Sequence, residues 1–286
     1  MTVTMKGSEV AAAMKEQLAQ EVGQLRESGV APTLAIVRVG ARPDDLAYER
    51  GAMKRMESVG IGCQVFEFPE TIGQKEFEQG FAAVNQNPGI HGILLFRPLP
   101  RHLDEEAVKR MIDPLKDIDS MGALNIAKVF SGDETGYAPC TAEAVMHVLR
   151  HYGIDVQGKR VTVIGRSMVV GKPLTMLLIK QNATVTVCHT RTKDLAATCR
   201  NAEILIAAAG KAKMVTADFV SEGAVVIDVG INVDEEGKLC GDVDFDAAAP
   251  KASHITPVPG GVGAVTSSVL AGHVVRAARY LHGIPS

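Results

Sequence analysis

The chain has 286 residues, of which 46% are hydrophobic, and its formal net charge is −3. This length suits one large domain or two ordinary ones with a real core. Charged residues are scattered, which argues against nucleic acid or a membrane surface as the main partner. We expect no signal peptide and no membrane span, because the apolar runs are too short. Five widely spaced cysteines indicate free thiols in a cytoplasmic compartment, without a metal site.

Short β-rich apolar runs alternate with helical patterns along nearly the whole chain. The expected strands cover residues 34–39, 63–68, 92–96, 160–164, 184–188, 204–208 and 224–229. The expected helices cover residues 8–28, 44–59, 74–85, 105–112, 141–151, 172–181, 195–200 and 265–282. Strands that are apolar on successive residues are typical of sheets covered on both faces, so the pattern predicts an α/β fold with parallel strands.

A domain boundary is expected near residues 137–141, where a polar stretch ends and a helix begins with Thr141 as its N-cap. We predict one domain from residues 1–139 together with 268–286, and a second from residues 140–267. The last helix would pack back on the first half of the chain. Two such lobes are expected to leave a cleft for a ligand.

The most informative local pattern joins the strand at 161–164 to a helix through Gly165-Arg-Ser-Met-Val-Val-Gly171-Lys-Pro173. Glycine lets backbone amides approach a phosphate, and a helix N-terminus favours its negative charge. Ser167 stands where the usual dinucleotide motif has its second glycine. The alternative is a tight turn without a ligand, but the strands that follow favour dinucleotide binding.

The strand at 184–188 ends in His189-Thr190-Arg191-Thr192. An enzyme that prefers NAD often has an acidic residue here, which holds the ribose 2′-hydroxyl. Arg191, with Arg166 in the preceding turn, instead suits a 2′-phosphate and favours NADP. The alternative for Arg191 is a solvated loop residue. Asp228 lies within an apolar run and needs partners, either in a ligand site or as a structural acceptor of backbone hydrogen bonds.

Four motifs occur in order along the chain: Lys116-Asp-Ile-Asp119, the turn from Gly165 to Pro173, Val226-Ile-Asp-Val-Gly-Ile-Asn232 and Pro257-Val-Pro-Gly-Gly-Val-Gly263. With these motifs the chain resembles the bifunctional methylenetetrahydrofolate dehydrogenase/methenyltetrahydrofolate cyclohydrolase (FolD) family. The resemblance extends from about Val39 to the final helix. It implies a Rossmann-like NADP-binding domain, an α/β folate-binding catalytic domain, and a homodimer formed through the cofactor domains.

The resemblance also implies the reaction and its residues. The enzyme would oxidise 5,10-methylenetetrahydrofolate with NADP as hydride acceptor, and the protein would supply orientation. Tyr48 would pack on the folate rings and Asp119 would hold the pterin. The loop of Pro259, Gly260, Gly261 and Val262 would lie against the folate. The implied cofactor contacts are Thr141, Gly165, Arg166, Ser167, Gly171, Pro173, His189, Thr190, Arg191, Gly210 and Ile231.

Two catalytic positions depart from the family pattern. The family has a catalytic lysine four residues after the tyrosine, where this chain has Ala52, and a glutamine partner of that lysine where this chain has Phe96. Lys54 lies ~200° around the helix from Ala52, so it cannot replace the missing cation. We therefore predict that cyclohydrolase activity is lost or weak.

Three alternatives stay open. In the first, the chain is a full bifunctional enzyme that uses another catalytic group. In the second, it is a non-catalytic paralogue that binds folate and NADP. In the third, it is an enzyme that acts on a related pterin carrier. Arg97 is a substitute cation that would orient the substrate but stay protonated, so it would not act as a base.

Overall fold

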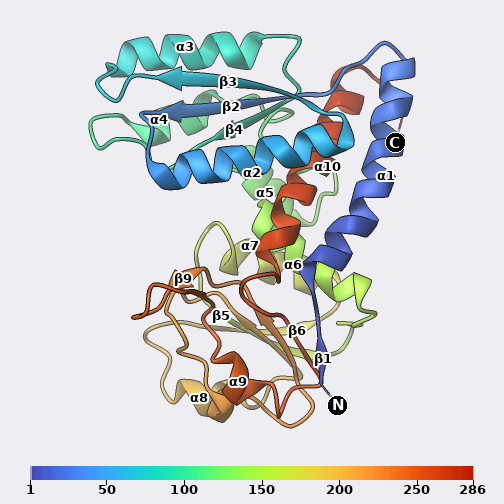
Figure 1. The fold of residues 1–286 in the computed structure, drawn as a ribbon, viewed down its shortest axis with the longest axis vertical. Helices are drawn as coiled ribbons and strands as arrows, with labels where there is room; N and C mark the ends of the chain where they lie inside the picture. The colour runs from blue at the N-terminus through green and yellow to red at the C-terminus, as the bar shows by residue number, and fades with distance from the viewer. Residues whose placement is uncertain (1, 286) are drawn as a thin grey trace. The chain divides into compact units, whose positions relative to one another are not determined.

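The computed structural model describes residues 2–285, which form two compact units. The six-stranded unit combines the N-terminal segment up to Ala12 with Pro139–Thr266. The three-stranded unit combines Ala13–Ala138 with the C-terminal segment from Ser267. Each unit has its own parallel sheet with helices packed on it (Figure 1). The predicted two-domain α/β class is therefore confirmed.

The large sheet is parallel throughout, in the order β1-β11-β8-β7-β5-β6. Its strands are β1 (Val3–Thr4), β5 (Arg160–Ile164), β6 (Thr184–Cys188), β7 (Ile204–Ala207), β8 (Val225–Asp228) and β11 (His254–Ile255). The helices of this unit are α6 (Cys140–His151), α7 (Gly171–Lys180), α8 (Leu195–Cys199), the 3-10 turn η1 (Ala217–Phe219) and α9 (Phe245–Ala248). A separate hairpin consists of β9 (Asn232–Val233) and β10 (Leu239–Cys240).

Burial along the strands follows their place in the large sheet. β7 and β8 are buried over their whole length, as expected for strands covered on both faces. β6 is mostly exposed, so that expectation is wrong for it, because β6 lies at the sheet edge. The two-residue strands β1 and β11 are not predicted, since they are too short to show any periodicity.

The N-terminal segment and α6 differ from the predicted boundary. β1 pairs with β11, and the Gly7 amide donates to the Gly260 carbonyl at 2.8 Å, so the residues up to Ala12 group with the large sheet. Helix α1 (Gly7–Glu27) then continues into the three-stranded unit. The predicted N-cap of α6 is wrong: Pro139 occupies the cap position, and Thr141 lies inside the first turn.

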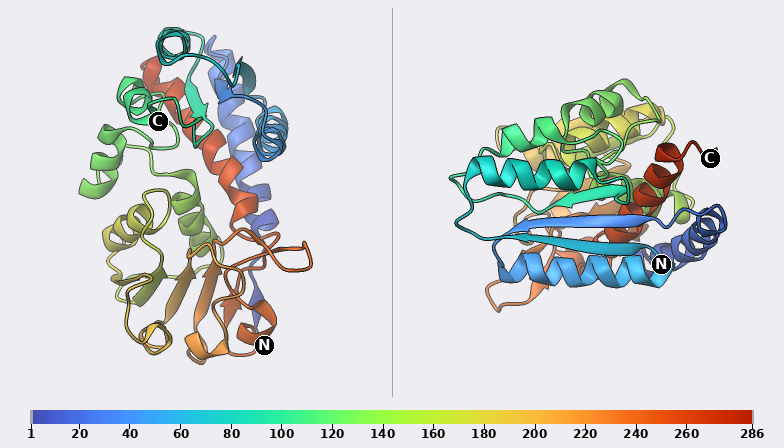
Figure 2. Two further views of the ribbon diagram at one scale, coloured as in Figure 1. Left: turned by 90° about the vertical axis from the view of Figure 1, so that its left-hand side faces the viewer. Right: turned by 90° about the horizontal axis from the view of Figure 1, so that it is seen from above.

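The small sheet is also parallel, in the order β3-β2-β4. Its strands are β2 (Thr33–Val39), β3 (Gly62–Phe68) and β4 (Gly92–Leu95), and its helices are α2 (Pro43–Val59), α3 (Gln74–Gln86), α4 (Glu105–Met111) and α5 (Ala123–Ser131). The last helix, α10 (Gly263–Leu281), continues into this unit from Ser267. Alternate residues of β2 (Ala35, Val37 and Val39) form one core with Phe77 and Phe81 of α3. Helices cover both faces of the sheet (Figure 2).

No helix within residues 2–285 combines the length and apolarity needed to cross a bilayer. All five cysteines are free thiols, and four of them are buried.

Candidate functional site

A glycine turn joins β5 to α7 at the carboxyl edge of the large sheet. Gly165 has a φ of 128°, and a Cβ on it would clash with the carbonyl oxygen of Ala208. A Cβ on Gly171, at the start of α7, would clash with the carbonyl oxygen of Gly165. Only glycine fits at either position. α7 begins without a side-chain cap. The Lys172 and Leu174 amides of its first turn donate to the Ser167 and Val170 carbonyls at 3.0 and 2.9 Å, and Pro173 has no amide hydrogen. An anion at this turn would therefore be favoured mainly by the positive end of the helix dipole.

The turn lies at the point where the order of the strands reverses. β6 flanks β5 on one side and β7 flanks it on the other. The Gly165 amide donates to the Cys188 carbonyl at 2.9 Å, and the Ala208 amide donates to the Ile164 carbonyl at 2.8 Å. The loops after the three strands are therefore joined. Open parallel sheets bind ligands at such a switch point.

The loop after β6 presents cationic and hydroxyl groups. The His189 amide donates to Thr192 Oγ1 at 2.9 Å, and His189 Nδ1 accepts from the Arg191 amide at 3.1 Å. This closed turn leaves Thr190 and Arg191 exposed, and Arg166 in the glycine turn is exposed as well. Residues 165–173 and 189–192 contain no carboxylate, and Asp194 lies at the start of α8, so the two arginines suit a 2′-phosphate.

The other predicted cofactor residues are placed as follows. Gly210 and Ile231 come after β7 and β8, so both emerge at the same carboxyl edge as the glycine turn. Ile231 is 69% exposed. Ser167 lies in the turn, where its Oγ accepts from the Val170 amide at 3.1 Å. Pro173 is buried in the first turn of α7.

The loop at residues 257–263 follows β11 and emerges at this edge too. Pro259 follows a cis peptide bond, and Gly260 has a φ of 98°. Pro259 and Gly260 are exposed, whereas Gly261 and Val262 are buried. Gly7 supports the loop from behind, since a Cβ on it would clash with the carbonyl oxygen of Gly261. The exposed Pro259 and Gly260 are therefore supported by closely packed residues beneath them.

Tyr48 and Phe96 form an aromatic pair in the three-stranded unit. Their ring centroids lie 5.6 Å apart, with 52° between the ring planes. Tyr48, on α2, is 43% exposed, and Phe96, directly after β4, is 6% exposed. The Phe96 amide donates to the Val37 carbonyl at 2.9 Å. An apolar ring that packs on Tyr48 thus occupies the position where the family resemblance predicts a glutamine.

Ala52 lies one turn after Tyr48 on α2 and belongs to its buried face, with Met56 and Val59. Lys54 is exposed, in agreement with its predicted place away from Ala52. The Arg97 guanidinium lies 3.9 Å from the Glu105 carboxylate, which Lys109 also approaches at 2.9 Å. The charge of Arg97 is therefore already partly compensated.

The predicted pterin carboxylate, Asp119, is partly exposed in a loop that other residues hold in place. The Ile93 amide of β4 donates to the Lys116 carbonyl at 2.8 Å. Asp117 is buried and accepts from Asn125 Nδ2 at 3.0 Å, and burial raises the pKa of its carboxyl group. His273 on α10 donates from Nδ1 to the Ile118 carbonyl at 2.7 Å. These contacts fix the backbone on the N-terminal side of Asp119.

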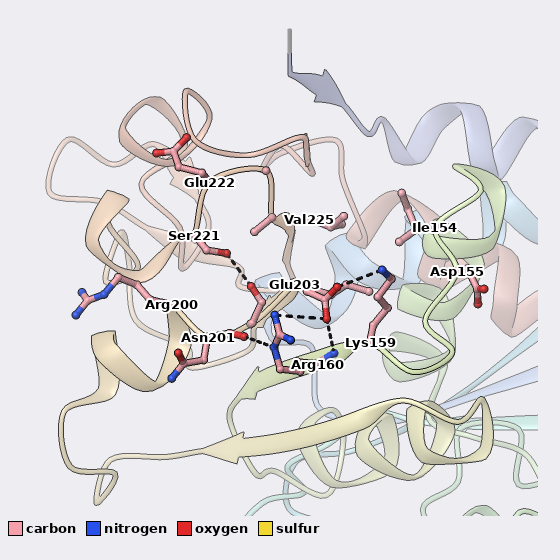
Figure 3. A pocket seen from close by; sticks show the side chains of 14 residues that line it. Ile154, Asp155, Lys159, Arg160, Arg200, Asn201, Glu203, Ser221, Glu222 and Val225 are labelled. Carbon is pink, nitrogen blue, oxygen red and sulfur yellow. Dashed lines mark hydrogen bonds and ion pairs between the residues drawn. The ribbon is translucent and has the colours of Figure 1, made fainter.

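A pocket also opens at the opposite edge of the large sheet, at the amino ends of β5, β7 and β8 (Figure 3). The Lys and Arg side chains that line it already have partners within the protein. Glu203 pairs with Lys159 at 3.1 Å and with Arg160 at 3.6 Å, and Arg200 donates to the Asp218 carbonyl at 2.7 Å. Because ligands of open sheets bind at carboxyl ends, this pocket does not belong to the dinucleotide site.

Sequence reasoning missed the residues that support the site from a distance. Gly7 and His273 lie far along the chain from the loops that they contact. Asp242 was missed as well, although it accepts from the Gly210 amide at 3.0 Å. None of these three positions carries a local signal, since a lone glycine, histidine or aspartate is common in loops and helices.

Comparison with known proteins agrees with this architecture. The tetrahydrofolate dehydrogenase/cyclohydrolase catalytic domain matches residues 5–119, and the NAD(P)-binding domain of the same family matches residues 139–282. The bifunctional protein FolD of Alkaliphilus oremlandii is 54% identical over 99% of this chain and 100% of its own length.

Two solved structures are also similar. The bifunctional FolD methylenetetrahydrofolate dehydrogenase/cyclohydrolase of Campylobacter jejuni has a TM-score of 0.95 and 38% identity, covering 98% of this chain and 99% of its own. The Trypanosoma brucei FolD, complexed with NADP and an inhibitor, has a TM-score of 0.91 and 36% identity, covering 98% of each chain.

The fold and the comparisons define a two-domain α/β protein with a catalytic domain and a Rossmann-like NAD(P)-binding domain. The chain belongs to the tetrahydrofolate dehydrogenase/cyclohydrolase family. The resemblance read from the four motifs is confirmed at this level.

Proposed function

We propose that this chain is an NADP-dependent 5,10-methylenetetrahydrofolate dehydrogenase of one-carbon metabolism. The observation that carries the proposal is the glycine turn at the strand switch point, beside the exposed Arg191, with no carboxylate among residues 189–192. The absence of side chains at Gly165 and Gly171 lets the turn pack tightly against the Ala208 and Gly165 carbonyls, which suits the close strand-to-helix turn of a diphosphate site. Arg166 and Arg191 would pair with the 2′-phosphate that distinguishes NADP from NAD.

NADP supplies the acceptor for the hydride that leaves the substrate's methylene bridge. The chain's own residues bind and orient the substrate and the cofactor, because the nitrogen lone pair of the substrate already drives hydride release. Tyr48 offers an exposed ring face for the folate ring system, and Asp119 offers a carboxylate to the pterin. The exposed Pro259 and Gly260 would lie against the folate. The resemblance further supports a cytoplasmic homodimer, whose mass light scattering would measure.

We propose further that hydrolysis of the methenyl product is lost or weak. That step requires water to be activated and protons to be moved, and a positioned acid–base group contributes about 10²–10⁴-fold. Ala52 and Phe96 place a methyl group and an apolar ring where the family has an amine and an amide. The nearby Arg97 stays protonated and is approached by Glu105, so it would not act as a base.

A second candidate function is the full bifunctional activity through another group. The names of the relatives favour it, since the 54% identical Alkaliphilus protein and the Campylobacter enzyme are both called bifunctional. If such a group exists, hydrolysis would survive in this chain without lysine at position 52.

One spectrophotometric assay separates these candidates. Purified protein is mixed with 5,10-methylenetetrahydrofolate and NADP, then separately with NAD, and reduced cofactor and methenyl product are both followed. We expect the two signals to rise together with NADP and the methenyl signal to decay at the buffer rate. A faster decay would establish the bifunctional candidate. No reduction with either cofactor would reject the dehydrogenase and leave a non-catalytic binding protein.

A pair of variants tests the reason for the loss. The double change Ala52→Lys with Phe96→Gln should accelerate methenyl decay by about 10²-fold or more. The matched control is Ala52→Met with Phe96→Gln, which has similar bulk without an amine and should bring no gain. If both folded variants behave alike, these two positions do not explain the loss.

A further inference from the structure

Two buried carboxylates interlock beneath the carboxyl edge of the large sheet. Asp242 has no exposed surface and Asp228 is 3% exposed. Asp228 Oδ1 accepts from the amides of Gly230 at 2.9 Å and Asp242 at 3.0 Å, and its Oδ2 accepts from the Val243 amide at 2.8 Å. Asp228 thereby fixes the backbone that carries the Asp242 side chain.

Asp242 in turn holds two separate loops. Its Oδ2 accepts from the amides of Ala209 and Gly210, and its Oδ1 accepts from the Lys211 amide at 2.8 Å. The same Oδ1 accepts from Asn232 Nδ2 at 2.9 Å. One carboxylate therefore joins the loop after β7 to the segment after β8.

Two glycines make room for this arrangement. A Cβ on Gly230 would clash with the carboxyl group of Asp242, and a Cβ on Gly241 would clash with the carboxyl group of Asp228. Each carboxylate thus occupies the space of a missing side chain. Both carboxylates bind backbone amides directly, so the loop positions depend on the two aspartates.

The loops that Asp242 holds belong to the proposed dinucleotide site. Gly210 and Ile231 are proposed cofactor contacts. Asp242 binds the Gly210 amide directly, and it binds Asn232, which follows Ile231 in the chain. The loop after β7 also supports the glycine turn, because Gly165 packs directly on the carbonyl of Ala208. A displacement of residues 209–211 would therefore reach the turn that would cradle the diphosphate.

We propose that Asp242 is a positioning residue for NADP, which holds the loops after β7 and β8 in their binding geometry while Asp228 orients Asp242. The inference rests on the proposed NADP-dependent function. A carboxylate suits this role because it accepts all four hydrogen bonds, whereas an amide of the same shape accepts on one atom only. Freed loops would have to be ordered again when NADP binds, which weakens affinity.

The test compares Asp242→Asn with Asp244→Ala. Asparagine is isosteric but turns an NH2 group toward two of the four donors. Asp244, two residues away, accepts from the Ala247 amide at 3.3 Å at the start of α9, so Asp244→Ala perturbs local stability without touching the two loops. Calorimetric titration with NADP gives Kd, steady-state kinetics give KM and kcat, and hydrogen exchange reports on amides 209–211 in the NADP-free protein.

We expect Asp242→Asn to weaken NADP binding by about tenfold to a hundredfold, through KM for NADP rather than through kcat. KM for the folate should stay within about twofold of wild type. Amides 209–211 should exchange faster in this variant, and Asp244→Ala should bind NADP as wild type does. If Asp242→Asn does not fold, Asn232→Ala, which removes one bond only, should weaken NADP binding in the same direction and by less.

Equal NADP affinity of wild type and the folded Asp242 variant would overturn the inference, as would equal weakening by Asp244→Ala. In the fallback, unchanged affinity of Asn232→Ala would overturn it. Failure of the wild-type protein to bind NADP would instead reject the proposed function, so the two failures are distinguishable.

Discussion

The buried histidine directly before β4 predicts a loss of stability in acid. His91 is 3% exposed, and its Nδ1 accepts from the Thr33 amide at 3.1 Å. Its Nε2 lies 3.2 Å from Nε2 of His282. Because Nδ1 accepts, the ring is neutral with its proton on Nε2, and protonation of Nδ1 would remove the Thr33 bond.

The magnitude follows from the pKa of His91. Burial, then the nearby His282 and Lys116, lower the pKa of His91 to about 4, from 6.5 for an unperturbed histidine. The unfolded chain therefore binds the extra proton first as the pH falls. A shift of about 2.5 units corresponds to about 3 kcal/mol at 1.36 kcal/mol per unit. This stability is fully present above pH 6.5 and is lost as the pH falls through 4.

The assay is urea unfolding of wild type and His91→Gln between pH 4 and pH 7.5. The free energy of unfolding of wild type, minus that of the variant, should rise by about 3 kcal/mol across this range. Phe81→Ala, which destabilises the same unit without removing a titratable group, should give a difference that is flat with pH. A difference for His91→Gln that changes by less than about 0.5 kcal/mol would refute the reasoning, since that lies within the uncertainty of extrapolated unfolding free energies.

Three further predictions concern single residues. Burial raises the pKa of Asp228 to about 6 from 3.8, so its contribution to stability falls by about 3 kcal/mol as the pH rises from about 4 through 6. Asp228→Asn should lack this slope in the same urea series, and an unchanged slope would contradict the assignment. Gly171→Ala should weaken NADP binding at least about tenfold in a calorimetric titration and lower stability by about 1–3 kcal/mol, because its Cβ meets the Gly165 carbonyl. If Gly171→Ala bound NADP with wild-type affinity, the turn would be able to shift and accommodate the added Cβ. Phe81→Ala, in a fully buried position, should lower the free energy of unfolding by about 3–5 kcal/mol, and a loss under about 1 kcal/mol would mean that its core collapses around the gap.

Much of the local structure is predictable from the chain. The alternation of apolar runs with helical patterns places β5 and β6 at the observed residues, because periodicity and side-chain shape act over a few neighbours. The glycine turn is recognisable from the order of strand, glycine and helix. The angular relation between Ala52 and Lys54 follows from helix geometry alone, and the structure shows the first buried and the second exposed.

Other features depend on contacts that no short window of sequence contains. The exposure of β6 is decided by its edge position, which is a property of strand order and not of the strand. The short strand β1 becomes visible only through its pairing with β11.

Helix periodicity, the glycine turn and the cationic loop after β6 were determined by the sequence itself, since backbone sterics and side-chain spacing are local. The support of the site was decided by tertiary structure alone. His273 reaches the Ile118 carbonyl across 155 residues, and Asp242 reaches the Gly210 amide across 32. A buried donor or acceptor must find a partner wherever the fold provides one, so packing, and not neighbouring sequence, selects that partner.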